Sequence, residues 1–402
     1  MYSVHSDNPE NTGIYAASLA HAAEPVRLLS THTNALYAPG AAGKNYLLWL
    51  RGAALVAQEF DLNTLKLIGE PHPVAEPLAS TPTTLSMNAA VSANGMLLYS
   101  SFNTLSQLTW LDRGGKPLAV IGEPGEYSSF RLGPDGRQIA TSRDWPGGTD
   151  LWLLDVERGV PSRLTFNLLS IYPVWSPEGR TILFTSNARD LYRKDARGGG
   201  IEHRITPSQN TAIANDWSRD GRSVLYYEVA PNTQRDLWIL PVTPEGRPAG
   251  DAKPRPYLQT RFNEWAGRFS PEARPNWVAF TSDDSGRNEI YIDAFPEPRS
   301  KTRISTSGGS FPQWSQEGRE LFYVSSDYKL MAVALKVGAD SIEPSAPREL
   351  FPLPAVDTGV SPYEVAPDGK RFLVRATPDQ TPRPLTVIVN WPALLKKGGA
   401  AP

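Results

Sequence analysis

The residues best suited to acid–base or nucleophilic chemistry are few and scattered in this chain. Histidine occurs five times, far apart and in predicted loops or strand ends: His5, His21, His32, His72 and His203. A serine nucleophile needs a histidine held against it and a carboxylate that orients that histidine. Serine is common, but the Gly-x-Ser-x-Gly turn of serine hydrolases does not occur. The sequence therefore predicts no catalytic residue, and we expect the histidines to be exposed.

Candidate phosphate and metal sites are equally weak. Residues 40–44 faintly resemble a phosphate-binding loop, but the spacing is wrong and Asn45 stands where serine or threonine is needed. Residues 144–150 and 283–289 are acidic, yet neither segment has the spaced oxygen ligands of a known calcium loop. Cysteine is absent, which excludes disulfides, thiolate chemistry and cysteine metal sites. We interpret the three segments as turns, and we expect no metal and no cofactor.

The charge and hydropathy of the chain exclude further classes of function. Its 402 residues include 40 basic and 42 acidic residues, well mixed, so nothing predicts attraction to nucleic acid or to anionic lipid. No segment approaches the ~20 apolar residues that span a bilayer. The first residues lack the basic and apolar regions of a secretion signal. The chain by itself therefore indicates no compartment, and we expect no membrane segment in it.

One short motif recurs along the chain. Its clearest copies, at residues 175–180, 217–222 and 314–319, read Trp-Ser-x-(Asp/Glu)-Gly-Arg. Residues 132–137 and 365–370 are close relatives, residues 91–96 and 269–274 are weaker, and residues 39–44 are degenerate. The copies are separated by 41 to 52 residues, close to the ~40–45 residues of a propeller blade. Because a tight turn needs a left-handed residue, we expect positive φ angles at Gly136, Gly179, Gly221, Gly318 and Gly369.

Short β-type runs follow each motif in a fixed order. The first run after the turn is clear at residues 181–185 and 223–227, the next at 150–155 and 236–240, and the last at 162–165 and 302–305. Four strands joined by tight turns and repeated many times are typical of propeller blades. The sequence predicts an all-β fold, a β-propeller of about eight four-stranded blades, with seven blades plus partial end blades as the alternative. A set of β-sandwiches would require the recurring order to be a coincidence.

The repeat predicts one propeller domain over residues 1–402. Within it we expect a partial N-terminal blade at 1–31, seven repeat blades at 32–352 and a closing C-terminal blade at 353–396. The two ends together offer six strands where one blade needs four. We interpret this surplus as a first blade that lacks its opening strand, which is expected if the chain is cut from a longer protein.

The innermost strand of each blade contains the candidate binding residues. An aromatic residue directly before the turn, as at Trp175, Trp217, Phe269 and Trp314, has the fixed position that packing between blades requires. Because strand side chains alternate, the preceding residue points into the channel. These channel residues are Arg131, Val174, Asp216, Arg268, Gln313 and Glu364, and the nearby loops hold Tyr127, Tyr172, Asn215, Trp265, Phe311 and Tyr363. Since large aromatics and arginine anchor partners, we predict a recognition face here. The alternative is that these residues only line a water-filled channel.

The turn motif followed by Asp-Leu-Trp strands, at residues 150–152 and 236–238, resembles the propellers of TolB and of WD40-like repeat proteins. Residues 47–52, 69–76, 109–116 and 388–391 are more similar to the C-terminal propeller region of bacterial eukaryotic-like serine/threonine protein kinases. That resemblance covers essentially the whole chain. In those proteins the propeller follows a kinase domain and a membrane helix, which implies a location outside the cytoplasm. The kinase motifs themselves are absent, so this chain cannot transfer phosphate.

These observations favour a non-catalytic binding or scaffold propeller, acting as the sensor or protein-interaction part of a larger, kinase-type signalling system. We expect a protein or peptide partner, or a small polar ligand, no nucleic acid, and a monomer. One alternative is a propeller enzyme or peptidase-associated accessory domain that acts on a small polar or peptide substrate. It would need clustered histidine or acidic residues at the channel mouth. Another alternative is a purely structural module that separates neighbouring domains.

Overall fold

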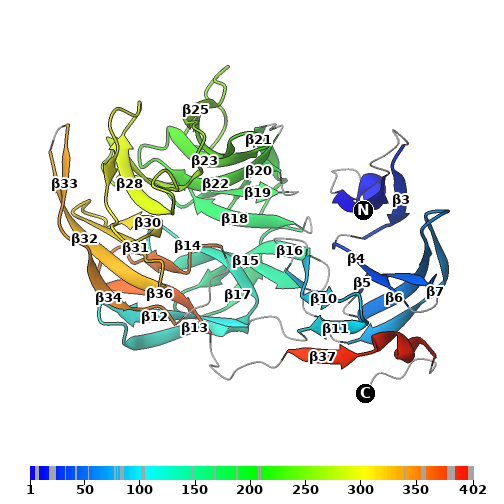
Figure 1. The fold of residues 1–402 in the computed structure, drawn as a ribbon. Helices are drawn as coiled ribbons and strands as arrows, with labels where there is room; N and C mark the ends of the chain where they lie inside the picture. The colour runs from blue at the N-terminus through cyan, green and yellow to red at the C-terminus, as the bar shows by residue number, and fades with distance from the viewer. Residues whose placement is uncertain are drawn as a thin grey trace. The chain divides into compact units, whose positions relative to one another are not determined.

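The chain divides into two compact units. The first unit comprises residues 1–104, 145–148 and 379–402, and the second comprises residues 105–144 and 149–378. The computed structural model describes residues 1–4, 9–17, 24–31, 33–40, 43–52, 54–76, 78, 80–81, 86–100, 105–145, 148–166, 169–186, 189–206, 208, 210–338, 340–354, 359–377 and 385–396. Almost all regular structure in these residues is β-strand (Figure 1), which confirms the predicted all-β propeller class.

The second unit contains six sheets of at least four strands. Five of them are built from strands that follow one another along the chain, as the repeat predicted. They are β14–β17 (Tyr127–Leu132, Gln138–Trp145, Gly148–Asp155, Pro161–Arg163), β18–β21 (Ser170–Trp175, Thr181–Ser186, Asp190–Asp195, His203–Thr206), β22–β25 (Thr211–Trp217, Ser223–Ala230, Gln234–Pro241, Arg255–Leu258), β26–β29 (Glu264–Phe269, Trp277–Ser282, Glu289–Ala294, Thr302–Arg303) and β30–β34 (Ser310–Trp314, Glu320–Val324, Lys329–Val337, Ile342–Pro344, Arg348–Pro352).

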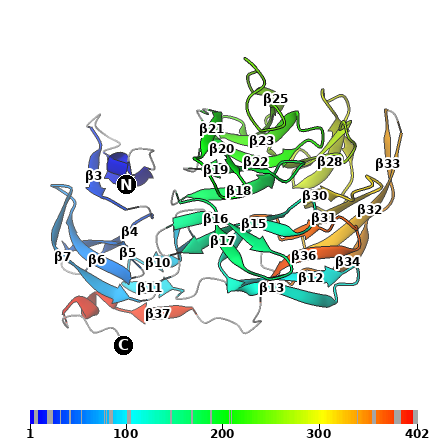
Figure 2. The ribbon, with the colours of Figure 1, turned by 180° about the vertical axis from the view of Figure 1, so that it is seen from behind.

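The sixth sheet joins the two ends of the second unit. Its order is β35 (Tyr363–Val365), β36 (Arg371–Ala376), β12 (Ser106–Asp112) and β13 (Pro117–Gly125). β36 pairs with β12 in antiparallel register from Gln107↔Ala376 to Asp112↔Arg371. Figures 1 and 2 both show β36 beside β12. This pairing closes the second unit on itself, because its last two strands complete a sheet begun by its first two.

The first unit has smaller sheets. One has four strands, β4–β7 (Leu36–Pro39, Asn45–Arg51, Ala54–Asp61, Lys66–Ala75), and two have three strands, β1–β3 (Tyr2–Val4, Gly13–Ala16, Val26–Leu29) and β10–β11–β37 (Ala89–Val91, Met96–Tyr99, Thr386–Val389). A short hairpin, β8–β9 (Ser80–Thr81, Ser86–Met87), and two 3₁₀-helices, Pro9–Asn11 and Trp391–Lys396, complete the described part. The Trp391 side chain is fully buried in the core of β4–β7, β10 and β11.

The grouping into two units differs from the predicted single domain of residues 1–402 and its boundaries at 31 and 352. The predicted closing blade, 353–396, is divided: β35 and β36 pair with β12, whereas β37 pairs with β11 of the first unit. A strand has only two edges. β36 pairs with β35 at one edge and with β12 at the other, so β37 cannot join this sheet beside β36. No helix among the described residues is long and apolar enough to cross a membrane.

The repeated aromatic residues pack between neighbouring sheets, as predicted. Trp175 lies with Leu151 and Leu153 of the preceding sheet and with Ile182 and Phe184 of its own. Its indole Nε1 donates a hydrogen bond to the backbone oxygen of a β14 residue, at 3.1 Å. Trp314 makes the equivalent bond to β26, at 3.2 Å. Trp175 and Trp314 therefore bury apolar surface and also tie their strands to the innermost strand of the sheet before them.

The turn glycines have the predicted left-handed conformation. The φ angles are +70° at Gly136, +71° at Gly179, +73° at Gly221, +71° at Gly318 and +63° at Gly369. Residues with a Cβ adopt this region only at a cost, most of all when they are β-branched. The motif therefore determines where each first strand ends and the second begins.

Substitution of Gly369 tests the conformational requirement without a steric clash, because nothing lies within 4 Å of a Cβ built at this position. We expect Gly369→Val to lower the free energy of unfolding of the second unit by about 1–2 kcal/mol, measured by urea titration. Gly199→Val is the matched control, since its Cβ is also unobstructed and its φ is not in the left-handed region. Equal effects of the two substitutions would contradict the turn assignment.

Candidate functional site

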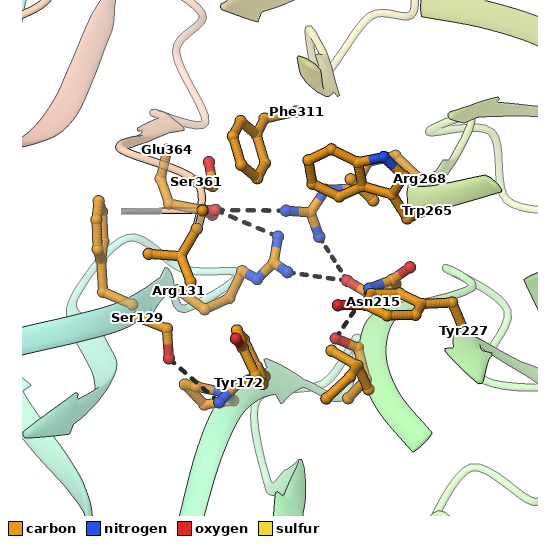
Figure 3. Close-up of a pocket in the computed structure, with 17 residues that line it drawn as sticks. Ser129, Arg131, Tyr172, Asn215, Tyr227, Trp265, Arg268, Phe311, Ser361 and Glu364 are labelled. Atoms are coloured by element: carbon orange, nitrogen blue, oxygen red, sulfur yellow. Dashed lines mark hydrogen bonds and ion pairs between the residues drawn. The ribbon is translucent and has the colours of Figure 1, made fainter. Parts of the chain in front are cut away.

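A pocket lies where the first strands of the sheets in the second unit approach one another (Figure 3). Its lining comes from β14, β18, β22, β26 and β30, from the segment that leads into β35, and from Tyr227 on β23. It encloses about 550 Å³, counted out to its open mouth. We call it the central pocket.

One carboxylate organises the charged side of the central pocket. Oε1 of Glu364 lies 3.2 Å from Nη1 of Arg131, 3.7 Å from Nη2 of Arg268 and 3.2 Å from Nε2 of Gln313. Both guanidinium groups also donate to the backbone oxygen of Asn215, at 2.8 Å and 2.5 Å. Figure 3 shows these groups converging from different strands. Five sheets are thereby connected through polar contacts at the centre of the unit.

The low exposure of these groups makes their charges strongly interdependent. The side chains of Arg131 and Arg268 are 17% and 12% exposed, and that of Glu364 is 7% exposed. Burial, and then the nearby charge of Arg268, lower the pKa of Arg131 to about 10. Burial raises the pKa of Asp216, although both arginines oppose that shift. Arg131 remains charged at neutral pH, so the pocket offers positive charge within a poorly hydrated site.

The aromatic side of the pocket depends on an unusual backbone conformation. Tyr172, Ala266 and Phe311 have positive φ angles of 56°, 53° and 59°, and each lies three residues before the aromatic anchor of its strand. The strand register shifts at these positions. Such conformations cost of order 1–3 kcal/mol each in residues other than glycine and concentrate at functional sites. The shift turns Tyr172 and Phe311 toward the pocket, where both line it.

Side chains of the preceding sheet hold this backbone in place. The N–H of Tyr172 donates to Oγ of Ser129 at 3.1 Å, and the N–H of Phe311 donates to Oγ1 of Thr281 at 3.3 Å. The N–H of Gly267 donates to Oδ1 of Asn215 at 3.1 Å. Each bond satisfies a backbone donor that the register shift removes from the strand ladder. The pocket wall is therefore built on rigid, cross-linked strands.

The structure brings together most of the predicted binding residues. Those that line the central pocket are Arg131, Tyr172, Asn215, Trp265, Arg268, Phe311 and Glu364. Nε2 of Gln313, which is not part of the lining, lies 3.2 Å from Oε1 of Glu364. Oδ2 of Asp216 accepts a hydrogen bond from the N–H of Phe269, at 2.9 Å. These two residues support the charged groups rather than line the pocket. Whether the set binds a ligand is a proposal, argued below.

Three predicted residues lie elsewhere and are corrected here. Tyr127, Val174 and Tyr363 are buried in the cores between sheets, not at the pocket mouth. The hydroxyl of Tyr363 donates to the backbone oxygen of Phe311 at 2.9 Å. Tyr363 lies two residues before the anchor position of its strand, and Tyr127 lies five before, whereas Tyr172 and Phe311 lie three before, so the positions differ. Val174 points away from Trp175, as alternation predicts, but that face of its sheet packs against the next sheet, where Val174 joins a core with Ala214 and Trp217.

Sequence reasoning missed Tyr227 and Arg235. Tyr227 lines the pocket from the second strand of its sheet, whereas the predicted residues all lie on or next to first strands. The guanidinium carbon of Arg235 lies 5.0 Å from the Trp265 ring centroid and 5.8 Å from that of Tyr227. No local motif signals such contacts, because they join residues of two different sheets. The pair of adjacent tyrosines at 226 and 227 was the only available sign, since strand alternation must send one of them away from the blade core.

Histidine and metal chemistry find no support in the described residues. His203 begins β21 and His72 lies on β7, and neither lines the central pocket. His5, His21 and His32 lie outside the residues that the structure describes. Within the described ranges, no group of three or more histidine or acidic residues is placed to hold a metal ion.

A buried carboxyl group lies beside the aromatic wall. Glu264, the first residue of β26, is 1% exposed and accepts a hydrogen bond from Oγ1 of Thr260 at 2.6 Å. Its Oε2 has no hydrogen-bond partner among the described residues. Burial is the main cause that raises the pKa of Glu264 to about 7, with smaller contributions from the charges of Asp236 and Asp283. The group next to Trp265 therefore titrates near neutral pH.

Comparison with known proteins supports the fold. A curated protein of Agrobacterium fabrum, described as uncharacterized protein Atu1656, is 26% identical over 216 residues, which cover 48% of this chain and 68% of that protein. The solved structure of putative TolB from Agrobacterium tumefaciens has 17% identity and a TM-score of 0.51, covering 69% of this chain and 100% of that one. TolB from Acinetobacter baumannii has 13% identity and a TM-score of 0.44, covering 82% and 78%. No family model matches the chain. The chain thus contains a TolB-like β-propeller fold.

Removal of the shared carboxylate should weaken the second unit. We expect Glu364→Ala to lower its free energy of unfolding by about 2–4 kcal/mol, because two buried guanidinium groups lose their counter-charge. Glu343→Ala is the control: its ion pair with Lys336, at 3.0 Å, is exposed and should contribute about 0.5 kcal/mol or less. Urea unfolding of both variants tests this. A loss at Glu364 no larger than that at Glu343 would show that the network does not stabilise the fold.

Stability should depend on pH through Glu264. Its pKa is raised in the folded state, so the unfolded chain ionises first as pH rises from about 4.5 to 7, and the folded state is penalised over that interval. Glu264→Gln removes the penalty. We expect the variant to gain about 3 kcal/mol relative to wild type between pH 4.5 and pH 8. Thermal unfolding of both proteins across this range measures the difference. A gain that does not vary with pH, as expected for the exposed control Glu343→Gln, would refute the assignment.

Proposed function

We propose that the second unit is a non-catalytic binding propeller that recognises a peptide or a small polar ligand at the central pocket. The observation that carries this proposal is the pocket itself. Arg131 and Arg268 face Trp265, Phe311 and Tyr172 across one cavity. Aromatic and arginine side chains dominate the binding energy of protein interfaces, and a concave site lets them act together.

The rigidity of the site supports binding. Its polar and aromatic groups stand on strands rather than on long loops, and side chains of the preceding sheets hold their backbone. A site that is ordered before its ligand arrives loses less conformational entropy on binding. The positive φ angles at Tyr172 and Phe311 fit this interpretation. Such strained conformations lower stability, and they concentrate at functional sites, where the surrounding structure holds them.

The wider role is proposed from the resemblance described above. We propose that the propeller is the sensor or protein-interaction part of a larger, kinase-type signalling protein, that it works outside the cytoplasm, and that it is monomeric. Support comes from the sequence at residues 47–52, 69–76, 109–116 and 388–391. The reading frame directly upstream of Met1 tests this role. A kinase domain and a membrane helix in frame would support it, and an unrelated domain there would contradict it.

Selection of peptides tests the binding function. Random peptides displayed on phage are selected on the immobilised full chain, and the affinity of the enriched peptides is measured by calorimetry. We expect Ser361→Trp, which fills the pocket, and Trp265→Ala with Phe311→Ala, which opens it, to weaken binding at least about tenfold. Ser361→Trp keeps the test valid if removal of the two aromatic rings of the pocket wall disturbs folding.

Phe166→Ala provides the control, because Phe166 is an exposed aromatic residue that contacts Arg163 and Lys194 but does not line the pocket. It should leave peptide affinity unchanged. Enriched peptides that bind all variants equally would contradict a role for the central pocket. Cleavage or chemical change of a bound peptide would instead support the alternative of a propeller enzyme.

A further inference from the structure

Arg235 occupies an unusual place at the edge of the central pocket. It is the second residue of β24, and its guanidinium stacks on Trp265 and Tyr227, two aromatic residues of the pocket lining. No hydrogen bond or ion pair engages this guanidinium within the described part of the chain. An arginine held between two rings is fixed in position and is partly desolvated. Its N–H donors are therefore available to a ligand.

Arg268 also retains binding capacity. Its Nη1 donates to the backbone oxygen of Asn215, but its Nη2 is 3.7 Å from Glu364, too far for a hydrogen bond. Arg131, in contrast, lies within hydrogen-bonding distance of both Asn215 and Glu364. Arg268 therefore combines a fixed position with donors that no acceptor saturates.

The charge of the pocket favours an anionic ligand. The guanidinium groups of Arg131 and Arg268 line the pocket, and that of Arg235 stacks on two of its lining rings. The nearby carboxyl groups are those of Glu364, in the lining, and Asp216, behind it. Burial disfavours the charged form of Asp216. Glu364 is the only acidic residue in the lining of the central pocket among the residues that the structure describes. Positive charge next to apolar rings attracts an anion more strongly than the same charge in open water.

We infer that the central pocket recognises a carboxylate of an acidic peptide, held by Arg268 of the lining and by Arg235, which stacks on the Trp265 ring. This inference rests on the binding function proposed above and names its ligand class. A planar guanidinium matches a planar carboxylate with two parallel hydrogen bonds. The rings of Tyr172, Trp265 and Phe311 provide an apolar surface for the neighbouring peptide side chain. A phosphate group is also anionic, so it is the alternative ligand that the experiment must distinguish from a carboxylate.

Binding of defined peptides tests the inference on the full chain. Fluorescein-labelled hexaglutamate and hexaglutamine are titrated with the protein at pH 7.5 and about 50 mM salt, and anisotropy is recorded. We expect hexaglutamate to bind at least about tenfold more tightly than hexaglutamine. Arg235→Ala should remove most of this difference, and thermal unfolding should confirm that the variant remains folded.

Arg143→Ala is the matched control. The Arg143 guanidinium also stacks on two rings, 5.8 Å from the Tyr127 centroid and 5.6 Å from that of Trp152, but neither of these rings lines the central pocket. Its removal should change the affinity for hexaglutamate by less than about twofold. Equal losses at Arg143 and Arg235 would indicate attraction of polyanions to the general surface, and would overturn the inference.

Further outcomes separate this inference from the proposed function. Competition by free glutamate at a lower concentration than by inorganic phosphate supports a carboxylate site, and the reverse order overturns it. No preference for hexaglutamate over hexaglutamine also overturns it. If phage-selected peptides lose affinity in Ser361→Trp but not in Arg235→Ala, the binding function stands and the carboxylate preference fails. If no peptide depends on the pocket, the proposed function fails as well.

Discussion

The hydrogen bonds between β12 and β36 join strands from opposite ends of the second unit, and the central pocket depends on them. They place β36 at the edge of the first sheet, and β36 in turn positions β35, which carries Glu364. Without Glu364 at the centre, Arg131 and Arg268 would be buried without their carboxylate partner. A closed arrangement also leaves fewer free strand edges, so it protects the unit from pairing with other chains. One pairing thereby links the stability of the ring to the geometry of its site.

Each first strand contributes some of its residues to the cores between sheets and others to the pocket. The aromatic anchor at the turn end packs against the preceding sheet and bonds to its backbone, as Trp175 and Trp314 do. Three residues earlier, the strand shifts register and presents a side chain to the pocket. Apolar burial at the anchor offsets the cost of the strained residue nearby. Packing between sheets and lining of the pocket thus fall to different residues of the same short strand.

Burial of these charges costs desolvation free energy, and packing of the sheets alone would not require them. A buried ion pair is often no more stabilising than apolar residues of the same volume, because desolvation opposes the attraction. Here two guanidinium groups share one carboxylate, and the resulting excess of positive charge is incompletely balanced by Asp216. Glu264, buried beside Trp265, adds a second group whose ionisation disfavours the folded state. Such an arrangement is expected where a binding partner, absent from the free protein, supplies the missing interactions.

Local sequence determined much of this protein. The spacing of the turn motif, the glycines with positive φ and the strand runs predicted an all-β propeller of four-stranded sheets, because turns and alternation are properties of neighbouring residues. The same alternation located Arg131, Arg268 and Glu364, which the structure brings into one network. Only the tertiary structure decided that β12 completes the sheet of β36, that Tyr127 and Tyr363 belong to cores, and that Arg235 reaches Trp265. Register shifts and pairings between distant strands set these features, and their energies depend on contacts that no local pattern records.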